Sequence, residues 1–222
     1  MGSIPMKKKN TRLEKKEIAE IVATLFAKKG FVGTTMRDIS KGLNVSIASV
    51  YYHFKNKEDI LFYIIESIGE ELLSFLKKAK YETDDPLDQL YNMLTTHAIL
   101  TIKKGKWVKV YVEEQHNLSK KSRVSIYRQH REIYDLYSEQ IRKLEGCNEI
   151  HPGLLPVATF AIFGMINWCY WWYKQDGALT IGQIAEKLTK ILFHGIVINH
   201  DGNNELTPDV NSLLPKTPFA IF

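Results

Sequence analysis

The segment TTMRDISKGLNVSIASVYYHF, residues 34–54, decides the fold of this chain. Its apolar residues recur at helical spacing on both sides of a short break, which predicts helices over about residues 35–43 and 46–54. The break contains Asn44, a residue type that tolerates left-handed backbone, and Ser46 can cap the second helix through its hydroxyl. Two short helices joined by a tight turn predict a helix-turn-helix.

Helical periodicity continues through the rest of the chain, and we therefore predict an all-α protein. A helix that begins near Thr11 and ends at Gly30 completes a three-helix N-terminal head. Asn56 caps a long helix, about residues 57–81, which we expect to connect this head to a larger helical body. Further helices are predicted over about residues 86–103, 107–116, 119–145, 155–174 and 181–199.

The predicted elements divide the chain into a head of residues 1–55, a body of residues 56–200 and a loose C-terminal tail of residues 201–222. The charge is divided unevenly as well. Residues 1–57 contain 12 Lys and Arg but 4 Asp and Glu, a net charge of +8, although the net charge of the whole chain is only +5. A basic head on a mildly acidic body favours a polyanionic partner, either nucleic acid or an anionic membrane surface.

Composition excludes several other classes. The chain is 45% hydrophobic, which argues against disorder, and its 2 cysteines, Cys147 and Cys169, have neither zinc-ligand spacing nor a disulfide framework. We expect reduced thiols in a cytoplasmic protein. No apolar leader is visible in residues 1–12, so export is not expected, and residues 1–6 can be partly an expression leader.

One segment raises the question of a membrane span. Residues 150–173 contain no charged side chain over 24 positions, which is long enough to cross a bilayer. However, Pro152, Gly153 and Pro156 interrupt the segment, and its second half is amphipathic rather than lipid-facing. We expect instead a buried helix, covered by its own domain on one face and by a partner or ligand on another, and no membrane partner.

A helix-turn-helix contacts DNA in a defined way. The first residues of its second helix face base edges in the major groove, while helix starts and cations hold phosphates. We therefore expect base contacts from Ser46, Ile47, Ala48 and Ser49. Backbone contacts are expected from Thr35, Arg37, Tyr51, Tyr52, His53 and Lys57.

Two parts of the predicted DNA contact have alternative interpretations, and a third consideration requires a second copy of the chain. Either Tyr51 or Tyr52 can instead pack between helices. The basic residues Lys7, Lys8, Lys9, Arg12, Lys15 and Lys16 form an arm that can reach the minor groove, or a solvated tail. A helix this short cannot specify a long site alone, so we expect a homodimer on a palindromic double-stranded DNA site.

The last two predicted helices are the natural dimer interface, since each carries a stripe of small and apolar residues. The expected interface residues are Gly164, Trp168, Trp172, Ile184, Leu188, Ile191, Gly195 and Ile198. The body also has an unusual aromatic content, typical of a cavity for a hydrophobic small molecule, although the same residues can form core and interface. The expected lining includes Trp107, Tyr111, Tyr134, Phe163, Asn167, Trp168 and Trp171.

No catalytic signature accompanies these features. The 7 histidines do not form a zinc-protease motif, and neither a nucleophile elbow, a phosphate loop nor a dinucleotide fingerprint is present. We expect no catalytic residue, metal or cofactor. His97 and His116 can line the cavity or be ordinary core or surface residues. The alternatives to a protein that binds a specific DNA sequence are a non-specific nucleic-acid binder and a helical enzyme.

Residues 30–61 resemble the tetracycline-repressor (TetR) family of bacterial transcription regulators. The matching residues are Gly30-Phe31, Thr34-Thr35, Ile39, Val45-Ser46, Tyr51-Tyr52-His53-Phe54, Lys57 and Leu61. The chain departs from the family pattern at Leu43, Asn44, Ile47 and Ala48, where Ala, Gly, Lys or Pro, and Gly are usual. The resemblance implies an all-helical repressor that dimerises through a four-helix bundle.

A looser resemblance concerns the body. Residues 105–115, Leu118-Ser119, residues 163–168, Trp172-Tyr173 and Asp176-Gly177 are similar to the acyl-CoA-responsive branch of the family, which represses lipid or sterol catabolism. This resemblance implies an acyl-CoA effector whose chain lies between the body helices, with Gln115 in the lining. Its phosphates would lie near Arg128, Arg131 or Lys174, because these cations suit phosphate contact.

Overall fold

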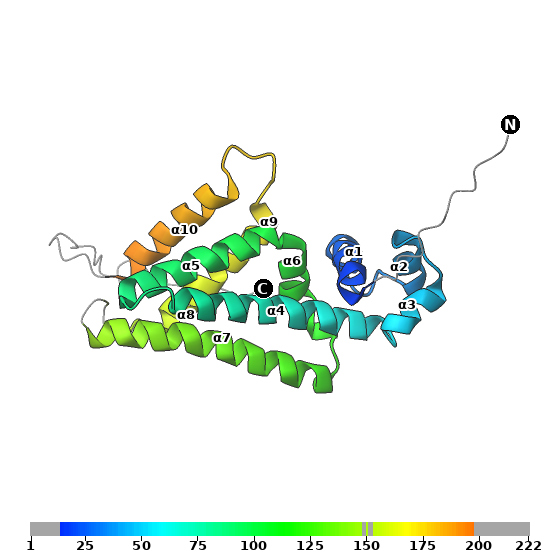
Figure 1. Cartoon of the computed structure of the whole chain (residues 1–222), viewed down its shortest axis with the longest axis horizontal. Helices are drawn as coiled ribbons and strands as arrows, with labels where there is room; N and C mark the ends of the chain where they lie inside the picture. The colour runs from blue at the N-terminus through cyan, green and yellow to red at the C-terminus, as the bar shows by residue number, and fades with distance from the viewer. Residues whose placement is uncertain (1–13, 148–149, 151–152, 198–222) are drawn as a thin grey trace, which may run out of the picture.

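The computed structural model describes residues 14–147, 150 and 153–197, and these residues form α-helices with one isolated β-bridge between Ile150 and Val197 (Figure 1). The head contains α1 (Lys15–Lys29), α2 (Met36–Gly42) and α3 (Ile47–His53). The body contains α4 (Lys57–Lys80), α5 (Pro86–Lys103), α6 (Gly105–Glu113), the 3-10 turn η1 (Gln115–Asn117), α7 (Lys120–Gly146), α8 (Leu155–Asn167), α9 (Cys169–Trp172) and α10 (Ile181–Ile196). The predicted all-α fold is confirmed.

Capping side chains set most of the helix starts, and the caps predicted at Ser46 and Asn56 are confirmed. Thr35 accepts a hydrogen bond from the Asp38 backbone N–H, and Ser46 accepts one from the Ser49 N–H. Asn44 lies between them with φ of 54°, the left-handed conformation that the tight turn requires. The side-chain oxygens of Asn56, Asp85 and Ser119 cap α4, α5 and α7 in the same way.

Some predicted boundaries were wrong. α1 begins at Lys15 rather than near Thr11, because Glu14 and Glu17 form a reciprocal capping box at that point; Thr11 itself lies outside the described residues. Only Lys104 separates α5 from α6, where a three-residue break was expected. The helix predicted over 155–174 is interrupted at Trp168 and ends at Trp172.

The interruption at Trp168 changes which side chains are covered. After it, Cys169 is buried in a small cluster with Ile102 of α5 and Ile184 of α10, while Trp168 and Trp171 stay exposed. The other thiol, Cys147, is exposed at the end of α7. Among the helices of the described ranges, none is both long and apolar enough to cross a membrane.

The long helix α4 connects two hydrophobic clusters. Residues of its first half share one cluster with residues of α1, α2, α3 and α6, and residues of its second half share the other with residues of α5, α7, α8 and α10. Figure 1 shows α4 running from the head along the body, with α7 beside it. α5 packs between α4 and α10, and α6 packs on both α1 and α4. Because Val50 and Phe54 share the first cluster with Ile60 and Ile64, packing is continuous across the predicted domain boundary at residue 55.

Close contact between α4 and α7 depends on Gly69. A Cβ at this position would collide with the side-chain amide of Gln129, whose Nε2 donates to the backbone carbonyl of Glu66 at 3.0 Å. At the last residue of α4, buried Lys80 pairs with Glu139 of α7 at 2.7 Å. This ion pair lowers the pKa of Glu139, chiefly through the hydrogen bond from Lys80. The two helices are thus held together by a close approach and by a polar contact.

We predict that Gly69→Ala lowers the free energy of unfolding by about 1–3 kcal/mol, because the added methyl group displaces Gln129 from a packed position. Chemical denaturation followed by circular dichroism measures the change. Gly182→Ala is the matched control, since Gly182 lies in α10 with open space around its Cα. The control should gain up to about 1 kcal/mol from helix propensity. A loss in both variants would contradict the proposed contact.

Candidate functional site

The N-terminal end of α3 presents an exposed surface. Ser46, Ile47, Ala48 and Ser49 are all exposed, and the next residue, Val50, is fully buried in the core of the head. The Ser46 hydroxyl lies 2.8 Å from that of Ser49, so the cap also fixes both side chains. The four residues predicted to face DNA bases therefore lie together on one rigid, accessible turn.

The predicted backbone contacts on α2 and α3 have different surroundings. Tyr51 and Tyr52 are 48% and 70% exposed, so neither is buried between helices. His53 is half-buried, and its ring meets that of Tyr52 edge-on at 5.0 Å. Arg37 is exposed in the first turn of α2. The Thr35 hydroxyl donates to Asp38 Oδ2 at 2.7 Å, which is the largest of the effects that lower the pKa of Asp38 to about 2.

Lys57 is used inside the protein, which differs from its predicted contact with DNA. Its Nζ donates to the backbone carbonyls of Phe31 at 2.6 Å and Thr34 at 2.7 Å, and it lies 4.1 Å from the centre of the Phe31 ring. Burial lowers the pKa of Lys57, and the nearby Glu114 carboxylate opposes this effect. We therefore assign Lys57 to holding the loop between α1 and α2 against the start of α4.

We expect Lys57→Met to lower the free energy of unfolding by about 1–3 kcal/mol, because the Thr34 carbonyl loses the ammonium donor and the Phe31 carbonyl keeps only the Thr34 N–H. Thermal or chemical denaturation measures the loss. Lys55→Met, at an exposed position two residues earlier, should have little effect. If Lys57 instead contacts phosphate, the variant would keep its stability and reduce the salt dependence of DNA binding.

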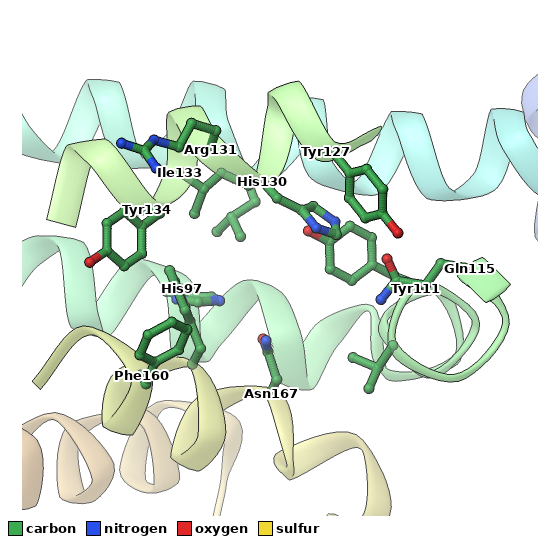
Figure 2. A pocket seen from close by; sticks show the side chains of 13 residues that line it. His97, Tyr111, Gln115, Tyr127, His130, Arg131, Ile133, Tyr134, Phe160 and Asn167 are labelled. Carbon is green, nitrogen blue, oxygen red and sulfur yellow. The ribbon is translucent and has the colours of Figure 1, made fainter. Parts of the chain in front are cut away.

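A cavity of about 430 Å³ lies in the body (Figure 2). Its walls come from α4, α5, α6, η1, α7 and α8, so most of the body helices contribute to it. The lining residues are Leu72, His97, Tyr111, Val112, Gln115, Tyr127, His130, Arg131, Ile133, Tyr134, Phe160, Phe163 and Asn167. A smaller space of about 20 Å³ shares Leu72, His97, Tyr111 and Asn167 with the cavity and reaches Gly69 of α4. The volume is within the range of small-molecule sites.

Most of the lining is aromatic or aliphatic, and its polar groups are few. The Tyr111 ring lies 5.0 Å from that of His130, and Tyr134 lies 5.8 Å from Phe160. Burial raises the pKa of the Tyr111 hydroxyl and lowers the pKa of His130. Both groups are thus neutral at physiological pH, and the cavity is suited to an apolar ligand with a few directed polar contacts.

The sequence prediction identified part of this lining. The structure brings together Tyr111, Gln115, Arg131, Tyr134, Phe163 and Asn167 of the predicted set. Trp107 lies outside the cavity, one turn closer to α1, where its indole Nε1 donates to Glu20 Oε2 at 2.8 Å. Trp168 and Trp171 are exposed and stack on each other instead, with ring centres 5.6 Å apart. These three tryptophans were wrongly predicted as lining residues.

Of the three charged residues predicted at the cavity, one lies there and two lie elsewhere. Arg131 lies at the cavity, where its Nε donates to Asp135 at 3.2 Å and its guanidinium lies 5.7 Å from the Tyr134 ring. Arg128 is exposed on α7 outside the lining, and Lys174 is exposed beyond α9. Neither residue contacts the cavity, because α7 turns Arg128 outward and the chain has left α8 before Lys174.

Sequence reasoning missed several lining residues. From the sequence, His97 is open between the cavity and an ordinary core or surface position, although its neighbours Met93, Leu94 and Ala98 indicate that it is buried. Tyr127 and His130 share a face with Tyr134 at helical spacing on α7, which was also visible. The remaining missed residues are the apolar Leu72, Val112, Ile133 and Phe160.

A second exposed surface lies on α8, α9 and α10. We call it the apolar face; it consists of Val157, Phe160, Gly164, Met165, Trp168, Trp171, Trp172, Ile191 and Gly195. No described atom lies close to a Cβ built at Gly164 or Gly195, so space is open above both glycines. Ile184 and Leu188 were predicted to belong here, but they pack against their own chain, because the inner side of α10 faces α5. Ile198 lies outside the described residues.

Two family profiles match the chain. Residues 83–196, about half of the chain, match the profile described as "Tetracyclin repressor-like, C-terminal domain". Residues 23–64 match "Bacterial regulatory proteins, tetR family". Together with the helix-turn-helix, these matches define a transcription regulator rather than an enzyme. The chain belongs to the TetR family, as the resemblance of residues 30–61 predicted.

Individual relatives support this assignment. The HTH-type transcriptional repressor KstR2 of Mycobacterium tuberculosis is 25% identical over 186 residues, which cover 81% of this chain and 91% of KstR2. The negative regulator of the icaADBC biofilm operon, IcaR of Staphylococcus epidermidis, is 35% identical over 99 residues. That alignment covers 45% of this chain and 52% of IcaR, so it spans about half the length of this relative.

Solved structures have the same fold. AibR in complex with isovaleryl coenzyme A and operator DNA has a TM-score of 0.73 at 27% identity, with 81% of this chain and 97% of the AibR chain covered. KstR2 of Mycobacterium tuberculosis has a TM-score of 0.78 at 22% identity, with 86% and 97% covered. These similarities confirm the predicted helical fold.

Proposed function

We propose that the protein is a homodimeric, cytoplasmic repressor that binds a palindromic operator and releases it when a hydrophobic small molecule enters the body cavity. The turn of residues 46–49 would read the base edges. Arg37, Tyr51, Tyr52 and His53 would contact the DNA backbone, as could Thr35 beside its capping role. KstR2 and IcaR are named as a repressor and a negative regulator, which supports repression over activation.

The observation that carries this proposal is the position of α6 between the cavity and the head. Tyr111 and Val112 of α6 line the cavity. One turn earlier, Trp107 bonds to Glu20 of α1, and Lys106 Nζ donates to the Thr24 hydroxyl of α1 at 3.2 Å. A ligand that shifts α6 therefore acts directly on the head.

The long helix α4 is the second mechanical link. It lines the cavity through Leu72, and at its first turn Glu58 accepts hydrogen bonds from the Ser119 backbone N–H at 2.8 Å and the Ser122 hydroxyl at 3.0 Å. Release of DNA requires that the ligand bind the conformation with the wrong head spacing more tightly than the DNA-competent one. Movement of α4 would change that spacing.

An acyl-CoA thioester is the proposed effector class. The support is the similarity to AibR, whose solved complex contains isovaleryl coenzyme A and operator DNA. A volume of 430 Å³ equals roughly fourteen water molecules at about 30 Å³ each, so the cavity suits an acyl group and leaves the coenzyme portion outside. Arg131 would then be the nearest cation for a phosphate.

We expect the purified dimer to shift its own upstream intergenic DNA in a gel, in preference to random DNA at the same salt concentration. Isovaleryl-, octanoyl- and palmitoyl-CoA are then added separately. Loss of the specific shift with one thioester supports both the repressor and its effector class. A specific shift that resists all three overturns the acyl-CoA assignment, whereas equal binding to random DNA indicates a non-specific binder.

A matched pair of variants tests the predicted base contacts in the same experiment. Ala48→Asp places a negative charge on the exposed turn of α3 and should weaken specific binding by at least about tenfold. Val124→Asp adds the same charge on an exposed position of α7, where no DNA contact is proposed. Equal effects of the two substitutions would argue against base contacts by α3.

We propose that the apolar face forms the dimer interface through α8 and α10, since a partner would cover its exposed tryptophans and approach closely over Gly164 and Gly195. Ile191→Glu, at a residue that is 60% exposed, should convert the dimer to monomer. Size-exclusion chromatography with light scattering measures this. Val124→Glu, 59% exposed on α7, should remain dimeric. A dimeric Ile191→Glu variant would place the interface elsewhere.

A further inference from the structure

The cavity contains imidazole groups whose hydrogen-bonding capacity is not used by the protein. His97 of α5 is fully buried and His130 of α7 is largely buried, and within the described part of the chain the Nε2 atoms of both lack a hydrogen-bond partner. Figure 2 shows the two rings reaching the cavity from different helices. A buried polar atom without a partner is costly, so the two Nε2 atoms are available for hydrogen bonds with a molecule that enters the cavity.

The surroundings of His97 determine which kind of contact is missing. Its Nδ1 lies 3.1 Å from the Tyr137 hydroxyl, and that hydroxyl donates to the Met93 carbonyl at 3.3 Å. We assign the single hydroxyl proton of Tyr137 to this carbonyl, so that the Nδ1–H of His97 donates to the hydroxyl oxygen. Nε2 therefore has a free lone pair and is a hydrogen-bond acceptor.

The imidazole also stays uncharged. Burial lowers the pKa of His97 to about 4, against the opposing effect of the Asn167 side chain. Of the lining residues, Arg131 is the one with a permanent positive charge, and it is already paired with Asp135. The inner part of the cavity thus lacks a charge that could stabilise a buried carboxylate.

We propose that the part of the effector that enters this cavity is a compact hydrophobic group bearing an uncharged hydroxyl, which donates its proton to His97 Nε2. The side-chain amide of Asn167 also lines the cavity and contains both a donor and an acceptor for the same hydroxyl. This inference rests on the proposed function in taking the cavity as the effector site. For a thioester effector, it means a hydroxylated acyl group.

Two isomeric probes isolate the hydroxyl proton. 1-Decanol and methyl nonyl ether contain the same atoms, but only the alcohol can donate a hydrogen bond. Decanoate adds the charged alternative. Calorimetric titration of the DNA-free dimer should give 1-decanol roughly tenfold tighter binding than either of the other two compounds. Equal binding of alcohol and ether, preference for decanoate, or no binding of any of the three would overturn the proposal.

Variants at His97 assign the preference to this residue. His97→Phe removes the acceptor and should reduce the alcohol-to-ether preference to near unity, whereas His97→Gln retains an acceptor oxygen on a side chain of similar reach and should keep most of it. A preference that survives in His97→Phe would overturn the role of His97. The comparison in the unaltered protein needs no variant, so it decides the ligand class even if His97→Phe fails to fold.

The outcome is separable from that of the proposed function. Probe binding is measured without DNA, whereas repression is tested by the shift of upstream DNA without probes. Specific DNA binding together with indifference to the hydroxyl would leave the regulator intact and remove only the inferred ligand chemistry. Hydroxyl-dependent binding without a specific DNA shift would support the inferred ligand chemistry and remove the proposed repressor.

Discussion

One rigid helix has to fit two cores at once, and the rest of the structure depends on this constraint. The 24 residues of α4 span about 36 Å, with the head packed on the first half and the body on the second. Gly69 lies near its middle, where a Cβ would displace the side-chain amide of Gln129 on α7. The position of the head relative to the body thus depends on how α4 packs, together with the contacts of α6 with α1.

The helix boundaries could be predicted because they depend on contacts between residues near in sequence. Thr35, Ser46 and Asn56 each bond to a backbone group three positions later, so the residue type alone indicates a helix start. The same local logic identified Asn44 in the turn. At the start of α1 the same local logic favours Thr11, whereas the structure has the capping box of Glu14 and Glu17.

The cavity was harder to predict, because its lining depends on which helices meet. Tyr111 and Trp107 lie four residues apart on α6, yet one faces the cavity and the other bonds to α1. A helix break at Trp168 keeps Trp168 and Trp171 away from the cavity, and no proline or glycine at the break predicts it. Lys57 is a cation at a helix start, as is typical of a phosphate contact. Only the position of the Phe31 and Thr34 carbonyls shows that its side chain points inward.

The contrast between the two thiols has a practical consequence. Burial raises the pKa of Cys169 to about 11, so this thiol is protonated and shielded at neutral pH, whereas Cys147 is exposed at the C-terminal end of α7. A maleimide dye would therefore attach at one position per chain in the unaltered protein. Two dyes in an assembled pair of chains would report, by energy transfer, on the separation of the two α7 ends in solution.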